Sequence, residues 1–339
     1  MQYDVYGIGN ALLDIQYDVS EEFLQQQNIA KGLMTYVDHH RQNEIMDLLG
    51  RDQIRQISSG GSVANSMIAM SQFGAKAFFS CRIGPDEAGD QYYNDMKSAG
   101  LHCNFDNSTR PEGYTGRCIV KVTPDADRTM CTNLGTSIEL CEDQLDIAAL
   151  KNSKYLYIEG YLTTSPSAMQ ATKKAIAVAK ENGIKIAITL SDPDIVTHFR
   201  SQFHELIDNG VDLIFCNEQE AKDFTETTTL SEAQEKLKQV TKTFAITIGP
   251  RGSIVYDGNE LITVPATEEK PIDTLGAGDM YAGAFLYGIT NGLSWEMSGL
   301  LANITSSKVV TIYGPRVSKE DSEELLKKCD AMQAEGVAA

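Results

Sequence analysis

A glycine turn and a carboxylate stand at the start of an apolar helical pattern in the stretch DTLGAGDMYAGAF, which begins at Asp273. Gly276 and Gly278 flank Ala277, and Asp279 follows directly. The free N–H groups and the dipole of a helix N-terminus favour negative charge, so capping alone can explain an acidic residue there. Capping does not explain why two aspartates and two glycines fall together. We therefore treat this turn as a candidate reaction site.

A second glycine turn leads into a predicted helix in the stretch SGGSVAN, residues 59–65. Glycine lets a ligand approach the backbone because no Cβ stands in the way. Asn65, in the first turns of this helix, can direct its amide at hydroxyl groups. Asp14, which follows Asn10 at the end of the first predicted strand, can accept hydrogen bonds from two vicinal hydroxyls. Taken alone, each of these residues also suits an ordinary turn or cap.

A possible magnesium site lies in CNEQEA, residues 216–221. Asn217 stands at the end of a predicted strand and Glu220 in the first turn of the helix that follows. A carboxylate in this position can hold Mg²⁺ through water. Because helix starts are rich in glutamate in any case, the pattern alone is a weak signal.

Two common nucleotide-binding motifs do not occur in the sequence. GIGNAL, residues 7–12, resembles a dinucleotide fingerprint, but Leu12 stands where the third glycine is required. No G-x-x-x-x-G-K-[ST] run is present. We therefore exclude a P-loop enzyme and reject a Rossmann dehydrogenase on this signal.

The elements that must position these residues alternate between strand and helix from residue 154 onward. Predicted strands cover 3–10, 76–84, 154–160, 185–190, 211–217, 244–249 and 253–258. Predicted helices cover 62–74, 167–183, a segment from 218, 231–240, 277–291 and 294–312. This alternation implies βαβ units, with a mostly parallel central sheet between two helical layers. Ligands in such sheets bind beyond the carboxyl ends of the strands, where Asn217 and Gly249 lie.

Two segments of the N-terminal third, about 12–38 and 112–136, predict a smaller β-sheet. They contain LLDIQYDV, LMTYVD, TGRCIVKVT and RTMCTNL, which read as strands with no intervening helix of their own. We expect these two segments to form a small β-sheet lid. This lid is expected to be inserted into a single domain that spans residues 1–339.

Composition limits the classes of partner. The formal net charge is -18 and the pI about 4.7, so the surface repels nucleic acid. The start MQYDVYGIGN predicts no secretory signal, and no run of about 18 apolar residues predicts a membrane span. Seven cysteines are scattered without a C-x-x-C pair, which favours reduced thiols in a cytosolic protein.

The motifs together resemble the PfkB (ribokinase-like) kinase family over essentially the whole chain. The resemblance rests on GGSVAN with FGAKAFFSCRIGPDEAGDQY, on TIGPRGS and Asn217-x-x-Glu220, and on DTLGAGDMYAGAF. Within the family, GIGNALLDI, RTMCTNLGTS and TLSDP are similar to the adenosine kinase branch. The sequence departs from that branch at Ala11, at 135–137 and at Asp192. These departures leave the nucleoside open.

The resemblance implies an ATP-dependent kinase with a ribokinase-like α/β/α core and assigns roles around the glycine turn. Gly276, Ala277 and Gly278 would form an anion hole for the γ-phosphoryl group. Asp279 would accept the proton of the substrate hydroxyl, and Arg128, where the lid returns, would lie beside the transferred phosphate. A solvated hairpin residue is the alternative for Arg128.

The remaining roles implied by the resemblance concern the two substrates and the cations. The substrate hydroxyls would be held by Asn10, Asp14, Gly60, Gly61 and Asn65. ATP would be bordered by Asn217, Thr247, Gly249, Gly252 and Gly278, with Asn303 a candidate for the adenine pocket. Mg²⁺ would be held through water by Asn217 and Glu220. K⁺ often accompanies this family, and Asp273 would help to hold it.

Three functions remain open at this stage. The first is phosphorylation of a nucleoside 5′-hydroxyl, adenosine to AMP, with the base against lid residues such as Leu12, Tyr36, Leu134 and Tyr161. The second is a sugar kinase of the same family, acting on ribose, fructose or a related sugar. The third is a binding protein without catalysis, which the intact motifs disfavour. The chain is expected as a monomer or as a homodimer formed through the lid, without nucleic-acid or membrane partners.

Overall fold

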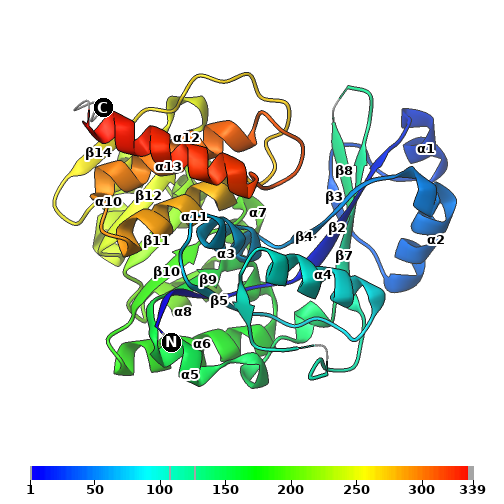
Figure 1. Cartoon of the computed structure of the whole chain (residues 1–339), viewed down its shortest axis with the longest axis horizontal. Helices are drawn as coiled ribbons and strands as arrows, with labels where there is room; N and C mark the ends of the chain where they lie inside the picture. The colour runs from blue at the N-terminus through cyan, green and yellow to red at the C-terminus, as the bar shows by residue number, and fades with distance from the viewer. Residues whose placement is uncertain (1, 107, 126, 335–339) are drawn as a thin grey trace.

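A nine-stranded sheet forms the centre of the computed structural model, which describes residues 2–106, 108–125 and 127–334 (Figure 1). In chain order its strands are β1 (Tyr3–Ile8), β5 (Ala77–Ser80), β6 (His102–Cys103), β9 (Ser153–Glu159), β10 (Lys185–Thr189), β11 (Leu213–Asn217), β12 (Thr243–Thr247), β13 (Ser253–Tyr256) and β14 (Leu261–Val264). Across the sheet they lie in the order β14-β13-β12-β11-β10-β9-β1-β5-β6. The seven strands from β12 to β6 are parallel, and β13 and β14 pair antiparallel at one edge. The predicted mostly parallel sheet is confirmed.

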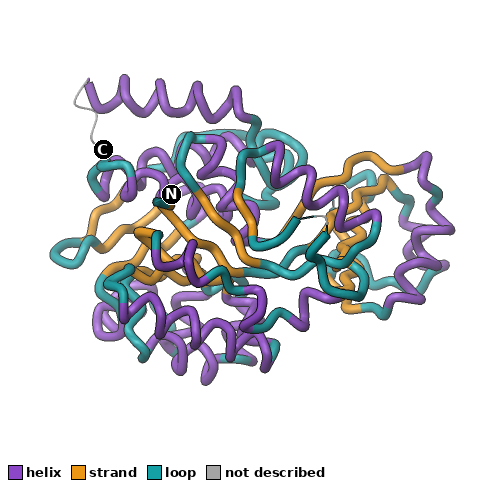
Figure 2. Tube along the Cα trace, turned by 60° about the horizontal axis from the view of Figure 1, so that its bottom comes forward, coloured by secondary structure: helices purple, strands orange, loops and turns teal. Residues whose placement is uncertain are grey.

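Helices cover both faces of this sheet, as Figure 2 shows. One face carries α3 (Ser62–Gln72), α11 (Ala277–Thr290) and α12 (Trp295–Val309), with α13 (Lys319–Ala334) packed on α12 and α4 (Glu87–Ser98) beside the second sheet. The other face carries α5 (Ile147–Lys151), α6 (Pro166–Glu181), α7 (Pro193–His198), α8 (Arg200–Ile207), α9 (Glu218–Thr225) and α10 (Leu230–Val240). Short 3-10 turns cover Arg51–Gln53, Thr136–Glu139, Glu142–Gln144, Gly160–Thr164 and Gly249–Arg251.

The core lies on both sides of the large sheet because successive side chains of a strand point to opposite faces. In β9, Tyr155 and Tyr157 belong to the cluster under α3, α11 and α12. Leu156 and Ile158 belong to the cluster under α6. A strand buried on both faces needs a continuous apolar run, as in the KYLYI segment.

The second sheet has five strands in the order β3-β8-β7-β2-β4 and protrudes from one side of the core (Figures 1 and 2). Its strands are β2 (Leu12–Asp18), β3 (Met34–Tyr36), β4 (Ile54–Gly60), β7 (Thr115–Val122) and β8 (Arg128–Gly135), and α1 (Glu21–Gln26) and α2 (His39–Leu49) accompany it.

The lid prediction was incomplete in two respects. The four expected strands are present, but β4 lies outside 12–38 and 112–136, and α1 interrupts the segment that was expected to lack a helix. β4 was missed because IRQISSG is mostly polar and ends in glycine. It pairs with β2 at the edge of the sheet and places Gly60 opposite Leu12.

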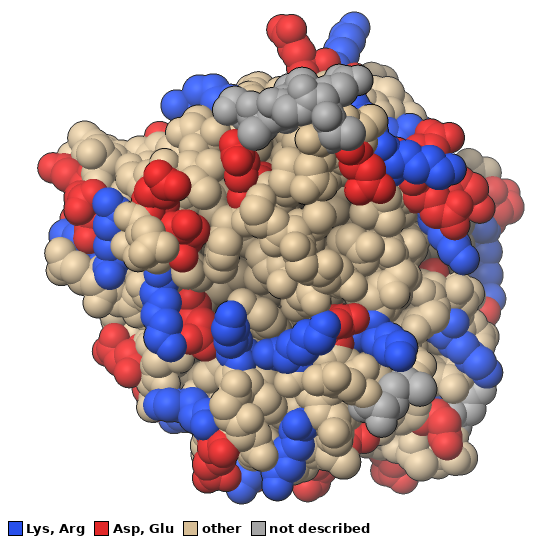
Figure 3. Space-filling view, turned by 60° about the vertical axis from the view of Figure 1, so that its left-hand side comes forward, with Lys and Arg blue, Asp and Glu red and all other residues tan. Residues whose placement is uncertain are grey.

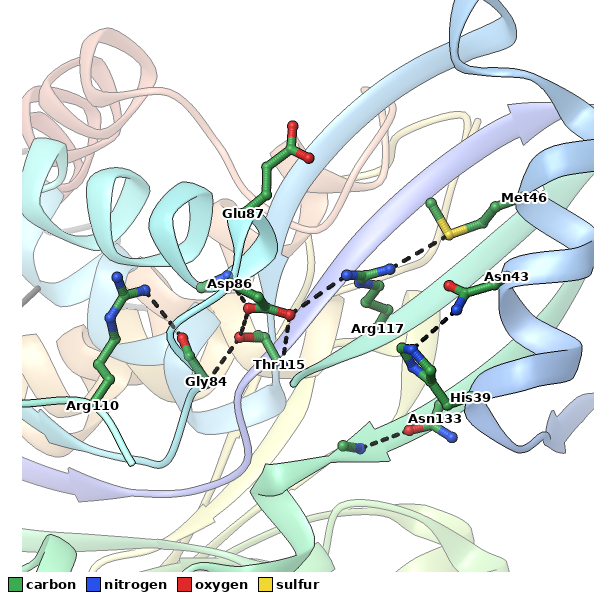
Figure 4. A network of polar contacts seen from close by, with 12 residues as sticks. His39, Asn43, Met46, Gly84, Asp86, Glu87, Arg110, Thr115, Arg117 and Asn133 are labelled. Carbon is green, nitrogen blue, oxygen red and sulfur yellow. Dashed lines mark hydrogen bonds and ion pairs between the residues drawn. The ribbon is translucent and has the colours of Figure 1, made fainter. Parts of the chain in front are cut away.

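A half-buried carboxylate, Asp86, joins the second sheet to the core (Figure 4). Asp86, the N-cap of α4, accepts hydrogen bonds from Gly89 N at 2.9 Å and from Thr115 N and Oγ1 at 3.0 and 2.6 Å. Arg117 pairs with the same carboxylate at 3.5 Å. Burial raises the pKa of Asp86, but the hydrogen bonds from Thr115 and Gly89 outweigh it and hold the pKa below its usual value. The base of β7 is thereby fixed to the start of α4.

Charges of both signs are spread over the surface. On the face drawn in Figure 3, Lys and Arg side chains form a row among scattered Asp and Glu side chains. Among the described residues, no helix is long and apolar enough to cross a membrane.

Candidate active site

The glycine turn at 276–278 forms the N-terminus of α11. Gly276 is the N-cap with φ 74°, a conformation that favours glycine, and a Cβ there would overlap the carbonyl oxygen of Pro315. The first backbone bond of the helix runs from Met280 N to Gly276 O at 2.8 Å. The N–H groups of Gly278 and Asp279 precede that bond and have no acceptor within the helix. They therefore remain available to an anion.

Asp279 lies in the first turn of α11 and is held by two side chains of α3. Ser62 Oγ donates to its Oδ1 at 2.6 Å, and Asn65 Nδ2 donates to its Oδ2 at 2.9 Å. Burial raises the pKa of Asp279 to about 6, and the two hydrogen bonds limit the rise. The carboxylate is therefore mostly ionised at pH 7. Asn65, predicted to contact substrate hydroxyls, bonds to Asp279 through Nδ2, while its Oδ1 is buried without a partner among the described residues.

Asp14 lies on β2 and faces the same cavity as Asp279. Its carboxylate rests against Gly60 of β4, so closely that a Cβ on Gly60 would overlap it. Gly61 follows with φ 107° and is the N-cap of α3. Burial raises the pKa of Asp14 to about 7; Arg316 opposes the rise and Asp279 adds to it. Gly60 and Asp14, both predicted to hold the substrate hydroxyls, thus lie in contact, and this close approach requires glycine at position 60.

A buried glutamate that the sequence analysis missed stands at the end of β9. Glu159 accepts hydrogen bonds from Asn10 N and Nδ2 at 3.2 and 2.9 Å and from Val63 N at 3.1 Å. Burial raises the pKa of Glu159 to about 7, although these hydrogen bonds act to lower it. Glu159 ties the end of β1 to the start of α3, so Asn10 reaches the cavity already bonded to protein. Its place at a strand end was the only available signal.

Three adjoining cavities connect these residues. The first, about 540 Å³, lies between the β12–β13 turn and α12, and the second, about 440 Å³, lies over the glycine turn. The third, about 330 Å³, lies between the second sheet and the core. The first two share Gly278, and the last two share Gly276 and Asp279. The glycine turn at 276–278 therefore borders all three cavities.

Most of the residues predicted to border ATP lie around the first cavity, whereas Asn217 lines the second. Thr247, Gly249, Gly252, Gly278 and Asn303 line the first cavity. A Cβ on Gly252 would overlap the carbonyl oxygen of Val264, so the turn needs glycine. Asn303 donates to Val264 O at 2.8 Å. A cleft of this size, ending at free helix N–H groups, fits a nucleotide with its phosphates toward Gly278.

Asn217 and Glu220 lie together on the second cavity but bind each other first. They form a capping box at the start of α9, in which Asn217 N and Nδ2 donate to Glu220 at 2.9 and 2.6 Å and Glu220 N donates to Asn217 Oδ1 at 2.8 Å. Burial raises the pKa of Glu220 to about 7. Among the described residues no group of three or more His, Cys, Asp and Glu could hold a metal. The pair therefore fits a magnesium ion only through water.

Arg128 projects from β8 to the loop before α11, where it forms an ion pair with Asp273. Leu275 N and Gly314 N also donate to Asp273, at 2.9 and 2.8 Å. Both carboxylate oxygens are thus taken by protein donors, a poor fit to the K⁺ role expected for this side chain. Arg128 also lines the second cavity, and its Nη1 is buried without a partner among the described residues.

The third cavity has a polar end and an apolar wall. Asp14, Asn65 and Asp279 stand at the polar end. The wall contains the four residues proposed to contact a base, Leu12, Tyr36, Leu134 and Tyr161. It also contains three apolar residues that were not predicted, Met34, Val120 and Met130.

Known proteins match the chain along most of its length. A sequence profile described as pfkB family carbohydrate kinase matches residues 28–322. Adenosine kinase of Saccharomyces cerevisiae is 26% identical over 334 residues, which cover 92% of this chain and 96% of that protein. Among solved structures, adenosine kinase from Sinorhizobium meliloti is 34% identical with a TM-score of 0.86, covering 96% of this chain and 100% of that one. A probable sugar kinase protein from Rhizobium etli CFN 42 is 30% identical with a TM-score of 0.87, covering 96% and 99%.

Proposed function

The chain belongs to the pfkB family of carbohydrate kinases, and from that premise we propose that it transfers the γ-phosphoryl group of ATP to the 5′-hydroxyl of adenosine. Phosphorylation of a hydroxyl group by ATP comes with the family and with its matched relatives. The observation that carries the choice of a nucleoside is the third cavity. It offers Asp14 for hydroxyls, Asp279 for proton transfer and a broad apolar wall opposite them.

In the proposed reaction, Asp14 and the Gly60–Gly61 turn hold the 2′- and 3′-hydroxyls. The 5′-hydroxyl then points to Asp279, which takes its proton. The freed oxygen bonds to the γ-phosphorus while the bond to the bridging oxygen of ADP breaks. The N–H groups of Gly278 and Asp279 stabilise the charge on the transferred group. Because burial brings the pKa of Asp279 only to about 6, the base is available at neutral pH.

Two cations belong to this proposal in different ways. Asn217 and Glu220 line the cavity over the glycine turn and would hold Mg²⁺ through water. Mg²⁺ supplies neutralisation of the phosphate charges when bound. The Asp273 carboxylate, expected to help hold K⁺, is already paired with the guanidinium of Arg128. The proposed reaction therefore does not involve K⁺.

The alternative, a sugar kinase, has support in the similar probable sugar kinase structure from Rhizobium etli. Both functions use Asp14 and Asp279. They differ at the apolar wall, since a purine base would cover Met34, Tyr36 and Met130 and a free sugar would not. An apolar wall distinguishes two bases by only about 1–3 kcal/mol of binding free energy for each small group in which they differ. We therefore expect inosine to be accepted more weakly than adenosine.

The test compares kcat/KM for adenosine, 2′-deoxyadenosine, inosine, ribose and fructose under one ATP and Mg²⁺ condition. We expect adenosine to be the best substrate. Loss of the 2′-hydroxyl should cost more than a change of base, because a site built to bind a hydroxyl rejects an analogue without it. Asp14→Asn serves as the matched variant and should reduce the difference in kcat/KM between adenosine and 2′-deoxyadenosine. Ribose or fructose as the best substrate would replace the nucleoside proposal with the sugar kinase.

A further inference from the structure

Arg316 stands outside every motif discussed above, yet it contacts the back of the substrate site. Its Nη1 donates to Ser59 Oγ at 3.2 Å, and its Nη2 pairs with Asp95 at 2.7 Å. Ser59 N donates to the same Asp95 carboxylate at 3.0 Å, and Ser59 Oγ is bonded to it as well. Ser59 is fully buried and immediately precedes Gly60. Arg316 thus fixes the last residues of β4.

The segment around Arg316 also touches the glycine turn of α11. Gly314 N donates to Asp273 at 2.8 Å, and the carbonyl of Pro315 lies against Gly276. Tyr313 packs under the guanidinium of Arg55, 4.0 Å from the ring centre. The segment therefore lies between the anion-hole loop and β4, and Arg316 is its contact with the hydroxyl-binding side.

The charge of Arg316 acts on Asp14. The charged and titratable neighbours of Asp14 are Arg316 on this segment, Asp279 on α11, Arg128 on β8 and Cys118 on β7. Burial has the largest effect on the pKa of Asp14 and raises it. Among the charged groups that lower this pKa, Arg316 has the largest effect. Arg128 lowers the pKa less and has its own partner, Asp273. Without Arg316, little positive charge would offset the repulsion between the carboxylates of Asp14 and Asp279.

We propose that Arg316 is a positioning residue of the substrate site, which holds the Ser59–Gly60 backbone against Asp14 and places a positive charge near that carboxylate. The inference rests on the proposed function, because it concerns the grip of Asp14 on the substrate hydroxyls. A carboxylate accepts two hydroxyl hydrogen bonds best when ionised. Arg316 does not contact Asp279, whose carboxylate is held by Ser62 and Asn65. Its loss should therefore weaken binding more than turnover.

The experiment compares wild type with Arg316→Met, Arg316→Lys and Lys319→Met. Lys319 is the matched control because it is exposed and lines the same outer cavity as Arg316. For Arg316→Met we expect KM for the nucleoside to rise at least about fivefold at pH 7, as expected for a rise of about one unit in the pKa of Asp14. The difference should shrink by pH 8.5, where Asp14 is ionised in both proteins. Arg316→Lys should recover part of the loss, Lys319→Met should match wild type, and kcat should change by less than about threefold.

A second measurement keeps this inference separate from the choice of substrate. NMR titration of protein labelled with ¹³C-aspartate, assigned with Asp14→Asn, reads the pKa of Asp14 without any substrate. We expect a higher midpoint in Arg316→Met than in wild type. An unchanged midpoint, or a rise in KM of equal size at both pH values, would overturn the inference. If wild type phosphorylates no nucleoside while the midpoint shifts, only the proposed function fails.

Discussion

Arg128, on the second sheet, is paired with Asp273, the first residue of the DTLGAGD turn, although the two are 145 residues apart in the chain. The Asp273 side chain is only 1% exposed, and two backbone N–H groups share its carboxylate. The second sheet is therefore fastened to the loop that presents the anion hole. This ion pair couples the position of the second sheet to the geometry of the glycine turn.

We expect Arg128→Ala to lower kcat by about 10²-fold with a smaller change in KM, because it removes a donor beside the transferred phosphate and releases Asp273. Steady-state kinetics with varied nucleoside and varied ATP provide the measurement. Arg55→Ala is the control, since Arg55 is also on the second sheet but pairs with Asp18 at 2.8 Å. A wild-type kcat in purified Arg128→Ala would show that Arg128 only pairs with Asp273 and takes no part in phosphoryl transfer.

Asp279→Asn should lower kcat by at least about 10²-fold, the scale for losing a general base. Nucleoside binding should stay nearly intact, because Asp14 and the SGG turn are untouched. Calorimetric titration measures the binding and initial rates measure kcat. Glu296→Gln is the control for helix capping alone, since Glu296 lies in the first turn of α12. Similar, small effects of the two substitutions would mean that Asp279 is merely a cap.

Ser62→Ala should shift the acid limb of the kcat profile to higher pH. The bond from Ser62 to Asp279 favours the ionised form, so its loss raises the pKa of Asp279 above about 6. A general base works deprotonated, and activity is lost as pH falls through its pKa; the variant should therefore lose activity at a higher pH. Rates should converge with wild type near pH 8. Ser66→Ala is the control, because Ser66 donates to the backbone oxygen of Asp279; equal profiles for the two variants would contradict the assignment.

Much of this site could be predicted from the sequence because its parts are local. The turn at 276–278, the strand end at Asn217 and the SGG turn each combine glycine or a cap with a helix start, which periodicity reveals. The mostly parallel sheet follows from the alternation of strands and helices in the same way.

The missing parts depend on contacts between distant segments. Glu159 bonds to Asn10, 149 residues away, and Ser62 to Asp279, 217 residues away. Neither side chain differs in type from the many Ser and Glu residues that only cap or solvate helices. β4 was missed because an edge strand needs little hydrophobicity. Arg128 was expected beside phosphate, but its pairing with Asp273 requires the second sheet to be in place.

Gly278→Ala should give a protein that folds at least as well as wild type but uses ATP poorly. Gly278 lies in the first turn of α11, and an added Cβ would meet nothing within 4 Å. Replacing glycine by alanine in a helix typically adds about 0.5–1 kcal/mol of stability. The same methyl group would enter the space shared by the first two cavities, where we place the phosphates.

Thermal unfolding and the KM for ATP test both halves of this prediction. We expect Tm to be unchanged or higher and kcat/KM for ATP to fall at least about tenfold, while nucleoside binding is retained, because one blocked anion-hole donor costs about 10²–10³ in comparable sites. Gly276→Ala is the contrasting variant. Its positive φ and the overlap with Pro315 should lower Tm. Wild-type kcat/KM for ATP in Gly278→Ala would show that the phosphates do not approach this turn, and a lower Tm would show that the space beside Gly278 is not free.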